Sequence, residues 1–154
     1  MGLHPDLARS VNISIPKAGN LISAYALCVV LPDTSMDEYT EAEQAAERLR
    51  DGYADYFSRY DALITHVLPI PAHKHGVEEF VIDGQNVDAT YLQGATVPLN
   101  VTALPGVSMR FGTSREGLPI NVQIIGAWQA ESTILHVASL LESVSPTHGL
   151  HPSL

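Results

Sequence analysis

The side chains best suited to chemistry in this 154-residue chain include a group of histidines. His66, His73 and His75 fall within ten residues, and two glutamates follow them. A His-x-His segment in extended conformation can present two imidazoles to a metal ion. However, the segment contains no cysteine and no helical histidine pair, and Lys74 separates two of the histidines. We therefore expect solvated loop histidines and no metal site.

A second pattern with chemical potential is Ser14-Ile-Pro-Lys17, in which a lysine close to a serine could take its proton. Enzymes that use such an S-x-x-K pair also carry Ser-Asp-Asn and Lys-Thr-Gly elements, and this sequence has neither. We interpret the match as coincidental. The sequence also lacks a G-x-S-x-G turn, a phosphate-binding loop, a dinucleotide fingerprint and a zinc-protease helix motif. We assign no catalytic residue and no cofactor.

Composition and charge narrow the class of protein. With 45% hydrophobic and only 16% charged residues, the chain can bury enough apolar surface to fold. Seventeen acids against eight bases give a net charge of −9, which repels phosphate backbones and anionic lipid. We expect no nucleic-acid partner.

Membrane insertion and secretion are also disfavoured by the sequence. The longest apolar run, 26–31, is far shorter than the roughly 20 residues that span a bilayer. The first residues lack a basic segment followed directly by an apolar one, and the single cysteine, Cys28, cannot form an internal disulfide. The sequence predicts a cytoplasmic protein with no membrane partner.

The clearest predicted element is a helix over 36–60. Ser35 and Glu38 have the spacing of a capping box, which satisfies donors at a helix N-terminus. Apolar and aromatic residues recur at spacings of four and three along one predicted face, namely Ala42, Ala46, Leu49, Tyr53, Tyr56 and Tyr60. Nine acids lie between Asp33 and Asp61, and we interpret them as a solvated outer face.

The rest of the chain alternates between short strands and helices. The predicted elements are a strand over 61–65, a proline-rich loop over 66–76, a helix over 88–101 bent near Pro98, strands over 107–111 and 120–125, and a helix over 130–143. The two strands suggest a hairpin. The last helix is apolar over more than half its circumference, so we expect that face to be buried.

The chain ends are expected to be irregular, over 1–20 and 146–154. A short strand is predicted at 11–15, and the apolar stretch 21–31 fits a buried helix or a strand equally well.

Two segments carry a family resemblance. The stretch Thr96-Val-Pro-Leu-Asn100-Val-Thr102-Ala-Leu-Pro105-Gly106, followed by Gly117-Leu-Pro119-Ile-Asn-Val-Gln123-Ile-Ile-Gly126, resembles the C-terminal part of amidase-signature hydrolases. The order of the surrounding elements agrees over most of 37–143. The resemblance implies an α/β fold in which part of a mixed sheet is flanked by helices. Residues 1–154 would then form a single domain or a partial amidase-like domain.

Enzymes of this family hydrolyse carboxamide C–N bonds, or release ammonia from glutamine, with a triad of Ser, cis-Ser and Lys. This sequence has no Gly-Gly-Ser-Ser-Gly-type stretch, and its two lysines, Lys17 and Lys74, do not match the catalytic one. The resemblance therefore implies a C-terminal amidase fragment that is inactive alone. Its partner would be the missing N-terminal amidase portion or a second copy, and a complete enzyme would take a small-molecule amide. The alternatives are a non-catalytic binding or assembly module derived from an amidase, or part of a glutamine-dependent amidotransferase subunit.

The resemblance also implies candidate pocket residues. Asn100 and Thr102 match the family's Asn-x-Thr-x-x-Pro segment near the substrate pocket, and Gln123 matches a glutamine between apolar strand residues. These three residues are our predicted substrate-pocket set. The alternative is structural, because Asn and Thr cap helices and a buried glutamine satisfies backbone groups.

Three positions depart from the family pattern. His66 replaces a proline that is usual after Thr65, and Gly94 leaves the segment before Thr96 without the acid that glutamine-using subunits tend to carry. Ala103 replaces a glycine. If that glycine has a positive φ, alanine there costs about 1 kcal/mol or more.

Overall fold

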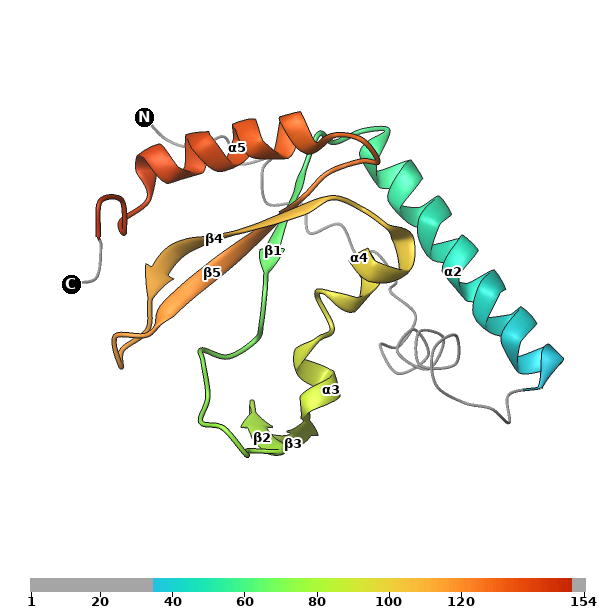
Figure 1. Ribbon diagram of the computed structural model, residues 1–154, viewed down its shortest axis with the longest axis horizontal. Helices are drawn as coiled ribbons and strands as arrows, with labels where there is room; N and C mark the ends of the chain where they lie inside the picture. Colours follow the sequence, from blue (N-terminus) through green and yellow to red (C-terminus); the bar gives the residue numbers. More distant parts are fainter. Residues whose placement is uncertain (1–34, 151–154) are drawn as a thin grey trace.

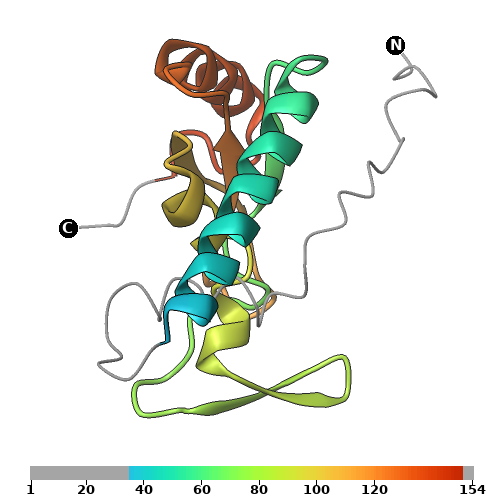
Figure 2. The same ribbon diagram turned by 90° about the vertical axis from the view of Figure 1, so that its right-hand side faces the viewer.

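The computed structural model describes residues 35–150. The predictions for 11–15, 21–31, Cys28 and the Ser14–Lys17 pair lie outside the described residues. A three-stranded sheet occupies the centre, with helix α2 (Met36–Phe57) along one side and helix α5 (Glu131–Val144) packed on β4 and β5 (Figures 1 and 2). In the part of the chain that the structure describes, no helix is long and apolar enough to cross a membrane.

The central sheet has the order β1–β5–β4, with β1 at Leu63–His66, β4 at Gly106–Thr113 and β5 at Pro119–Ile125. Both pairings are antiparallel, and Ile125 lies opposite Leu63 on one side and Gly106 on the other. The predicted hairpin is therefore confirmed as β4–β5, with an irregularity between Arg110 and Gly112. Helices around this sheet confirm the α/β class.

Helix α2 begins as the capping box predicts. The Ser35 hydroxyl accepts a hydrogen bond from the Glu38 backbone N–H at 3.3 Å, and the Glu38 carboxylate accepts one from the Ser35 N–H at 2.9 Å. The helix ends at Phe57 and not at Tyr60. The reason is a tighter turn, in which the Arg59 N–H donates to the Tyr56 carbonyl, and this turn leaves Tyr60 exposed.

The capping box makes helix stability depend on pH. Hydrogen bonds from Ser35, first from its backbone and then from its hydroxyl, hold the pKa of Glu38 below its ordinary value of 4.5. Its stabilising contribution is present above pH 4.5 and is lost as the pH falls through the lowered pKa. Glu38→Gln removes the titrating carboxyl and should therefore flatten the decline of the unfolding midpoint as the pH falls below 4.5, measured by circular dichroism. A decline of equal slope in both proteins would contradict this assignment.

The helix predicted over 88–101 is two short helices, α3 (Ala89–Leu92) and α4 (Val97–Thr102). Asp88 caps α3 by accepting from the Tyr91 N–H at 3.1 Å. Pro98 has no N–H to donate to the carbonyl four residues back, so one continuous helix cannot form. In the first turn of α4 the same proline is tolerated.

A second hairpin, which was not predicted, joins β2 (Glu79–Ile82) to β3 (Gln85–Asp88). Asp83 and Gly84 form its turn, with φ values of 50° and 75°. Positive φ at both turn residues matches the twist of a two-residue hairpin, and an Asp-Gly dipeptide is the sequence signal for it. Figure 2 shows this hairpin extending beyond α3, away from the central sheet.

The core forms where α2 and α4 meet one face of the sheet. Ile125 is 1% exposed and packs in one cluster with Leu49, Tyr53 and Leu104. The predicted apolar stripe of α2 is buried at Ala42, Leu49, Tyr53 and Tyr56. This cluster sets the position of α4 relative to β1 and β5.

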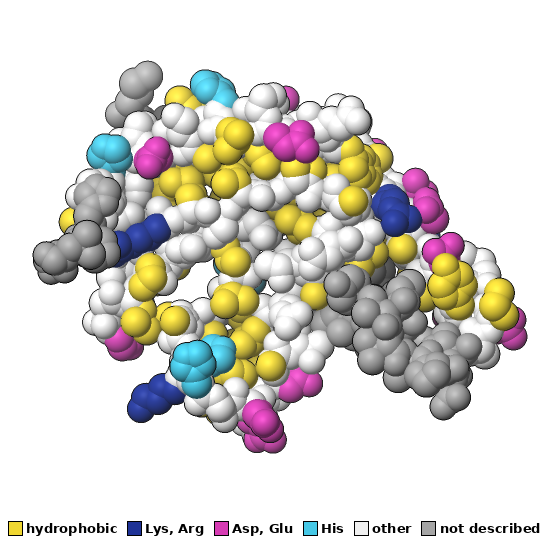
Figure 3. Space-filling model, viewed as in Figure 1, with side chains coloured by type: hydrophobic (Ala, Val, Ile, Leu, Met, Phe, Trp, Pro, Cys, Tyr) yellow, Lys and Arg dark blue, Asp and Glu magenta, His cyan; other side chains and the backbone are white. Residues whose placement is uncertain are grey.

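The prediction that the wide apolar face of the last helix is buried is wrong for part of that face. Ile134 is buried and Val137, Ala138 and Leu141 are half-buried, but Leu135 and Leu140 are 58% and 56% exposed. Val144, just beyond the predicted face, is 70% exposed. The helix contacts β4 and β5 on one side, and no second layer covers it within residues 35–150. Hydrophobic side chains reach the surface along the upper part of Figure 3, where α5 lies. Residues 146–150 follow as hydrogen-bonded turns.

Ala103 ends α4 in the left-handed region, with φ 55° and ψ 34°. The family pattern has a glycine at this position, and a glycine there suggested a positive φ, which the structure shows. An alanine in the left-handed region destabilises the folded state by about 1–2 kcal/mol. Replacing it by glycine would relieve this strain, but the greater freedom of glycine in the unfolded chain would cost about 0.4–1 kcal/mol. The balance favours glycine.

We therefore expect Ala103→Gly to raise the free energy of unfolding by about 0.5–1 kcal/mol, measured by urea denaturation. Ala103 is exposed, so no packing is lost. The matched control is Ala54→Gly, exposed within α2, which should lose about 1 kcal/mol because its backbone is ordinary helix. A loss at both positions would show that the left-handed conformation at Ala103 carries no strain.

Candidate functional site

A cavity of about 840 Å³ lies along β1 and is the candidate site. All four residues of β1 line it, together with Ile120, Asn121, Val122 and Ile125 of β5. The opposite wall is the α3–α4 segment, represented by Tyr91, Gly94, Ala95 and Pro98. Tyr53 of α2 and Pro69 of the proline-rich loop complete it. The cavity is therefore built from segments that are distant in the sequence.

Gln123 holds three of these segments together. Its side chain is 6% exposed, and its Nε2 donates to the Thr65 hydroxyl at 3.2 Å and to the Ala95 carbonyl at 3.0 Å. The Thr65 hydroxyl in turn donates to the His66 carbonyl at 3.0 Å. Because Thr65 and Ala95 both line the cavity, the buried amide fixes the spacing between its two walls.

Thr102 and Asn100 lie on α4, apart from Gln123. The Thr102 side chain is 1% exposed, and its hydroxyl donates to the Pro98 carbonyl at 2.8 Å. Asn100 is exposed. Neither residue lines the cavity, although Pro98 on the same helix does. A substrate contact by any of the three predicted pocket residues stays a prediction.

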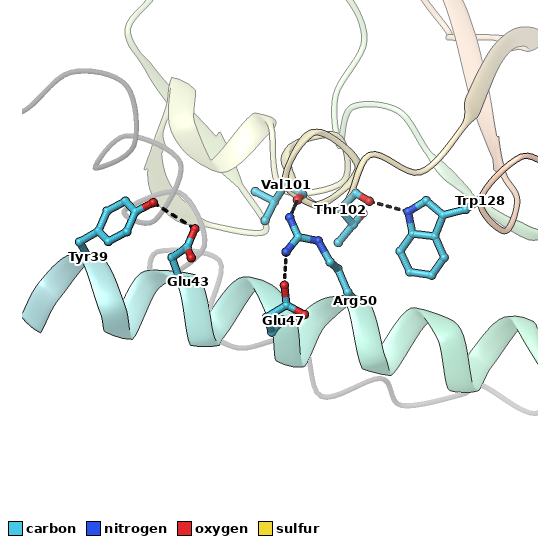
Figure 4. A network of polar contacts seen from close by, with 7 residues as sticks. All are labelled: Tyr39, Glu43, Glu47, Arg50, Val101, Thr102 and Trp128. Atoms are coloured by element: carbon cyan, nitrogen blue, oxygen red, sulfur yellow. Dashed lines mark hydrogen bonds and ion pairs between the residues drawn. The ribbon is translucent and has the colours of Figure 1, made fainter. Parts of the chain in front are cut away.

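Two residues outside the predicted set fix the end of α4 (Figure 4). Arg50 donates from Nη2 to the Val101 carbonyl at 3.1 Å, and the Trp128 indole donates to the Thr102 carbonyl at 2.7 Å. Carbonyl groups in the last turn of a helix have no partner within the helix, so these bonds satisfy them. Arg50 also forms an ion pair with Glu47, in which its Nη1 lies 2.6 Å from Glu47 Oε1. Nothing local in the sequence around Arg50 or Trp128 signals these long-range contacts.

The loop histidines are spread over different surroundings. His66 lines the cavity, whereas the His73 ring packs edge-on against Phe80 with 4.7 Å between ring centroids. Among residues 35–150 there is no group of three or more His, Cys, Asp or Glu side chains that could hold a metal ion.

The described lining of the cavity has one titratable side chain besides its tyrosines, the His66 imidazole. The same described lining contains no Asp, Glu, Lys or Arg. Burial raises the pKa of the Tyr53 hydroxyl, so this group stays protonated and uncharged at neutral pH. The described lining offers hydroxyl, amide and backbone groups and the His66 imidazole, but no paired nucleophile and base. Such a site can bind and orient an uncharged molecule.

A family model described as Amidase matches residues 11–135. The chain therefore belongs to the amidase family, which confirms the resemblance found in the sequence.

Two curated relatives illustrate how much of a family member's length this chain matches. A glutamyl-tRNA(Gln) amidotransferase subunit of Thermosynechococcus vestitus is 33% identical over 134 residues, which are 87% of this chain and 26% of that protein. The corresponding protein of Bdellovibrio bacteriovorus is 36% identical over 115 residues, or 74% of this chain and 22% of that protein. The chain thus spans about a quarter of the length of the curated relatives it matches.

Solved structures agree on the fold. The crystal structure of a glutamyl-tRNA(Gln) amidotransferase subunit from Thermotoga maritima covers 99% of this chain, with a TM-score of 0.63 and 26% identity, and the match is 30% of that protein. An inhibitor-bound vestigial protein complex, linked to the origins of an s-triazine catabolic enzyme, matches 82% of this chain and 33% of its own. Its TM-score is 0.69 at 22% identity, which shows the shared fold. Relatives of this chain thus include subunits of larger assemblies.

Proposed function

We propose that this chain supplies part of the substrate pocket of an amidase that hydrolyses the C–N bond of a small carboxamide. Family membership and the cavity beside β1 support this function. The observation that carries it is the buried Gln123 amide, which joins the cavity walls at Thr65 and Ala95. On this proposal residues 1–154 act as one partial amidase-like domain, located in the cytoplasm.

The proposal includes that the chain is inactive alone. Amide hydrolysis needs a nucleophile, a base that activates it and donors for the developing oxyanion. The sequence holds only two lysines, Lys17 and Lys74, and no Gly/Ser-rich stretch of the kind the family uses. Lys74 is exposed and does not line the cavity. Its partner would be an amidase portion that carries the triad.

Ammonia release is the direct test. The purified chain should release ammonia from benzamide and from glutamine no faster than buffer. Co-expression with the triad-bearing portion of a family member should yield an active complex. Release by the chain alone that is lost in a Lys17→Ala variant would contradict the proposal, because a contaminating amidase would not respond to that substitution.

A second candidate function is a non-catalytic assembly module, favoured by the exposed apolar residues of α5. Leu140 and Val144 are both more than half exposed, and contiguous apolar surface of this kind drives association. The module would dock on another chain or on a second copy of itself. Light scattering after size exclusion tests it, since a clean monomer that binds little hydrophobic dye would exclude this function.

A further inference from the structure

We infer that the cavity beside β1 takes the uncharged apolar or aromatic end of a carboxamide, and not an amino acid such as glutamine. This inference rests on the proposed function and names its substrate class. Three features of the described lining carry it: the absence of Asp, Glu, Lys and Arg side chains, the predominance of apolar surface, and the neutral character of its polar groups other than the His66 imidazole.

The first feature is charge. Glutamine bears an ammonium and a carboxylate beside its side-chain amide, and both must be desolvated to enter a pocket. A buried charge is tolerated when an opposite charge or several hydrogen bonds replace its water. The described lining offers no carboxylate and no ammonium or guanidinium group.

Among the arginines, Arg110 lies opposite the lining residue Asn121 in the β4–β5 register. Its Nη2 donates to the Thr113 hydroxyl at 3.0 Å, toward the far end of the hairpin. Arg110 does not line the cavity. Arg110 therefore supplies no positive charge to pair with the carboxylate of a bound glutamine.

The second feature is apolar surface. Leu63, Ile120 and Ile125 present aliphatic groups from the sheet, and Pro98 faces them from α4. Tyr53 and Tyr91 add two aromatic rings, which favour stacked or edge-on contact with another ring. A volume of about 840 Å³ lies within the range of small-molecule sites and accommodates an aryl group.

The third feature is that the hydroxyl and amide groups at the walls are neutral and mostly engaged in bonds with other parts of the protein. The Thr65 hydroxyl accepts from Gln123 and donates to the His66 carbonyl. The Asn121 amide donates to the Ser108 hydroxyl at 3.2 Å, which leaves its carbonyl oxygen available to accept from a carboxamide N–H. These groups suit an uncharged amide.

Ligand binding to the purified chain tests this inference without requiring catalysis. Benzamide and L-glutamine are titrated separately while the backbone amide signals of Thr65, Ala95 and Gln123 are followed by NMR. We expect benzamide to shift these signals with a dissociation constant at least about tenfold below that of glutamine, because only glutamine must desolvate unpaired charges.

A pair of variants locates the binding. Ile120→Asp places a carboxylate in the cavity wall at a side chain that is 43% exposed, so the fold should persist. Benzamide affinity should fall about tenfold or more, because binding would displace the water that hydrates the new carboxylate, and no partner replaces that water. Val81→Asp, 69% exposed on β2 and outside the cavity, is the control and should leave affinity unchanged. Circular dichroism verifies that both variants fold.

The outcomes separate this inference from the proposed function. Glutamine binding as tightly as benzamide at these same signals would overturn the substrate class and leave the cavity as a substrate pocket. Benzamide binding that is insensitive to Ile120→Asp would place the ligand elsewhere and overturn the inference. Binding of neither compound would overturn it too, and would remove the cavity from the proposed function.

Discussion

Ile125→Ala should lower the free energy of unfolding by about 3 kcal/mol. Ile125 is 1% exposed and joins α2 to the sheet through Leu49 and Tyr53. Substitution of a buried isoleucine by alanine costs about 2–5 kcal/mol, from lost transfer energy and from the cavity left behind. Because one side of Ile125 already borders the cavity beside β1, the middle of that range is expected. Urea denaturation followed by circular dichroism measures the loss.

Ile120→Ala is the matched control on the same strand. Its side chain is 43% exposed, so the same deletion removes little buried surface and should cost less than about 1 kcal/mol. Equal losses at both positions would show that the core is not centred on Ile125. A loss of about 3 kcal/mol is a large share of the 5–15 kcal/mol typical of a whole domain, so the difference is readily measured.

Gln123→Leu should cost about 2 kcal/mol although the two side chains are similar in size. The substitution removes both donors of the amide and leaves the Ala95 carbonyl and the Thr65 hydroxyl without this partner. A buried polar group that loses its partner costs about 1–3 kcal/mol. The α3–α4 segment should also loosen, because the bond from Gln123 to the Ala95 carbonyl is one of its ties to the sheet.

Two measurements test this second prediction. Urea denaturation gives the stability loss, and hydrogen exchange of the Thr96 and Val97 amides, which donate to the Gln93 carbonyl, reports the loosening. Asn121→Leu is the control, since Asn121 is exposed and water can replace its bond to Ser108. It should cost less than about 0.5 kcal/mol. Unchanged exchange in the Gln123 variant would show that other contacts position the wall.

The elements that sequence reasoning predicted well depend on local chemistry. The capping box at Ser35 and Glu38 and the spacing of Leu49, Tyr53 and Tyr56 involve residues within one or two helical turns. The strands of the β4–β5 hairpin are likewise close in the chain. The turn at Asp83 was missed, although its Asp-Gly dipeptide is a local signal too. Ala103 shows that a departure from a family pattern can predict a backbone conformation before the structure is known.

The features that were not predictable depend on distant partners. Gln123 bonds to residues 58 and 28 positions earlier, and no spacing rule connects them. The burial of α5 was misjudged because the pattern of a helix records which face is apolar, not whether another layer covers it. Such coverage depends on the rest of the molecule, and the chain spans about a quarter of its curated relatives. Within residues 35–150 no second layer covers Leu140 and Val144.

The bond between Trp128 and the end of α4 gives this protein a built-in optical reporter. Trp128 is the only tryptophan in the 154 residues, so all tryptophan emission comes from one indole. That indole is 39% exposed and donates to the Thr102 carbonyl at 2.7 Å. Detachment of α4 from the β5–α5 turn would transfer the indole to water and shift its emission to longer wavelength. Label-free fluorescence can therefore reveal whether α4 separates before the core around Ile125 unfolds.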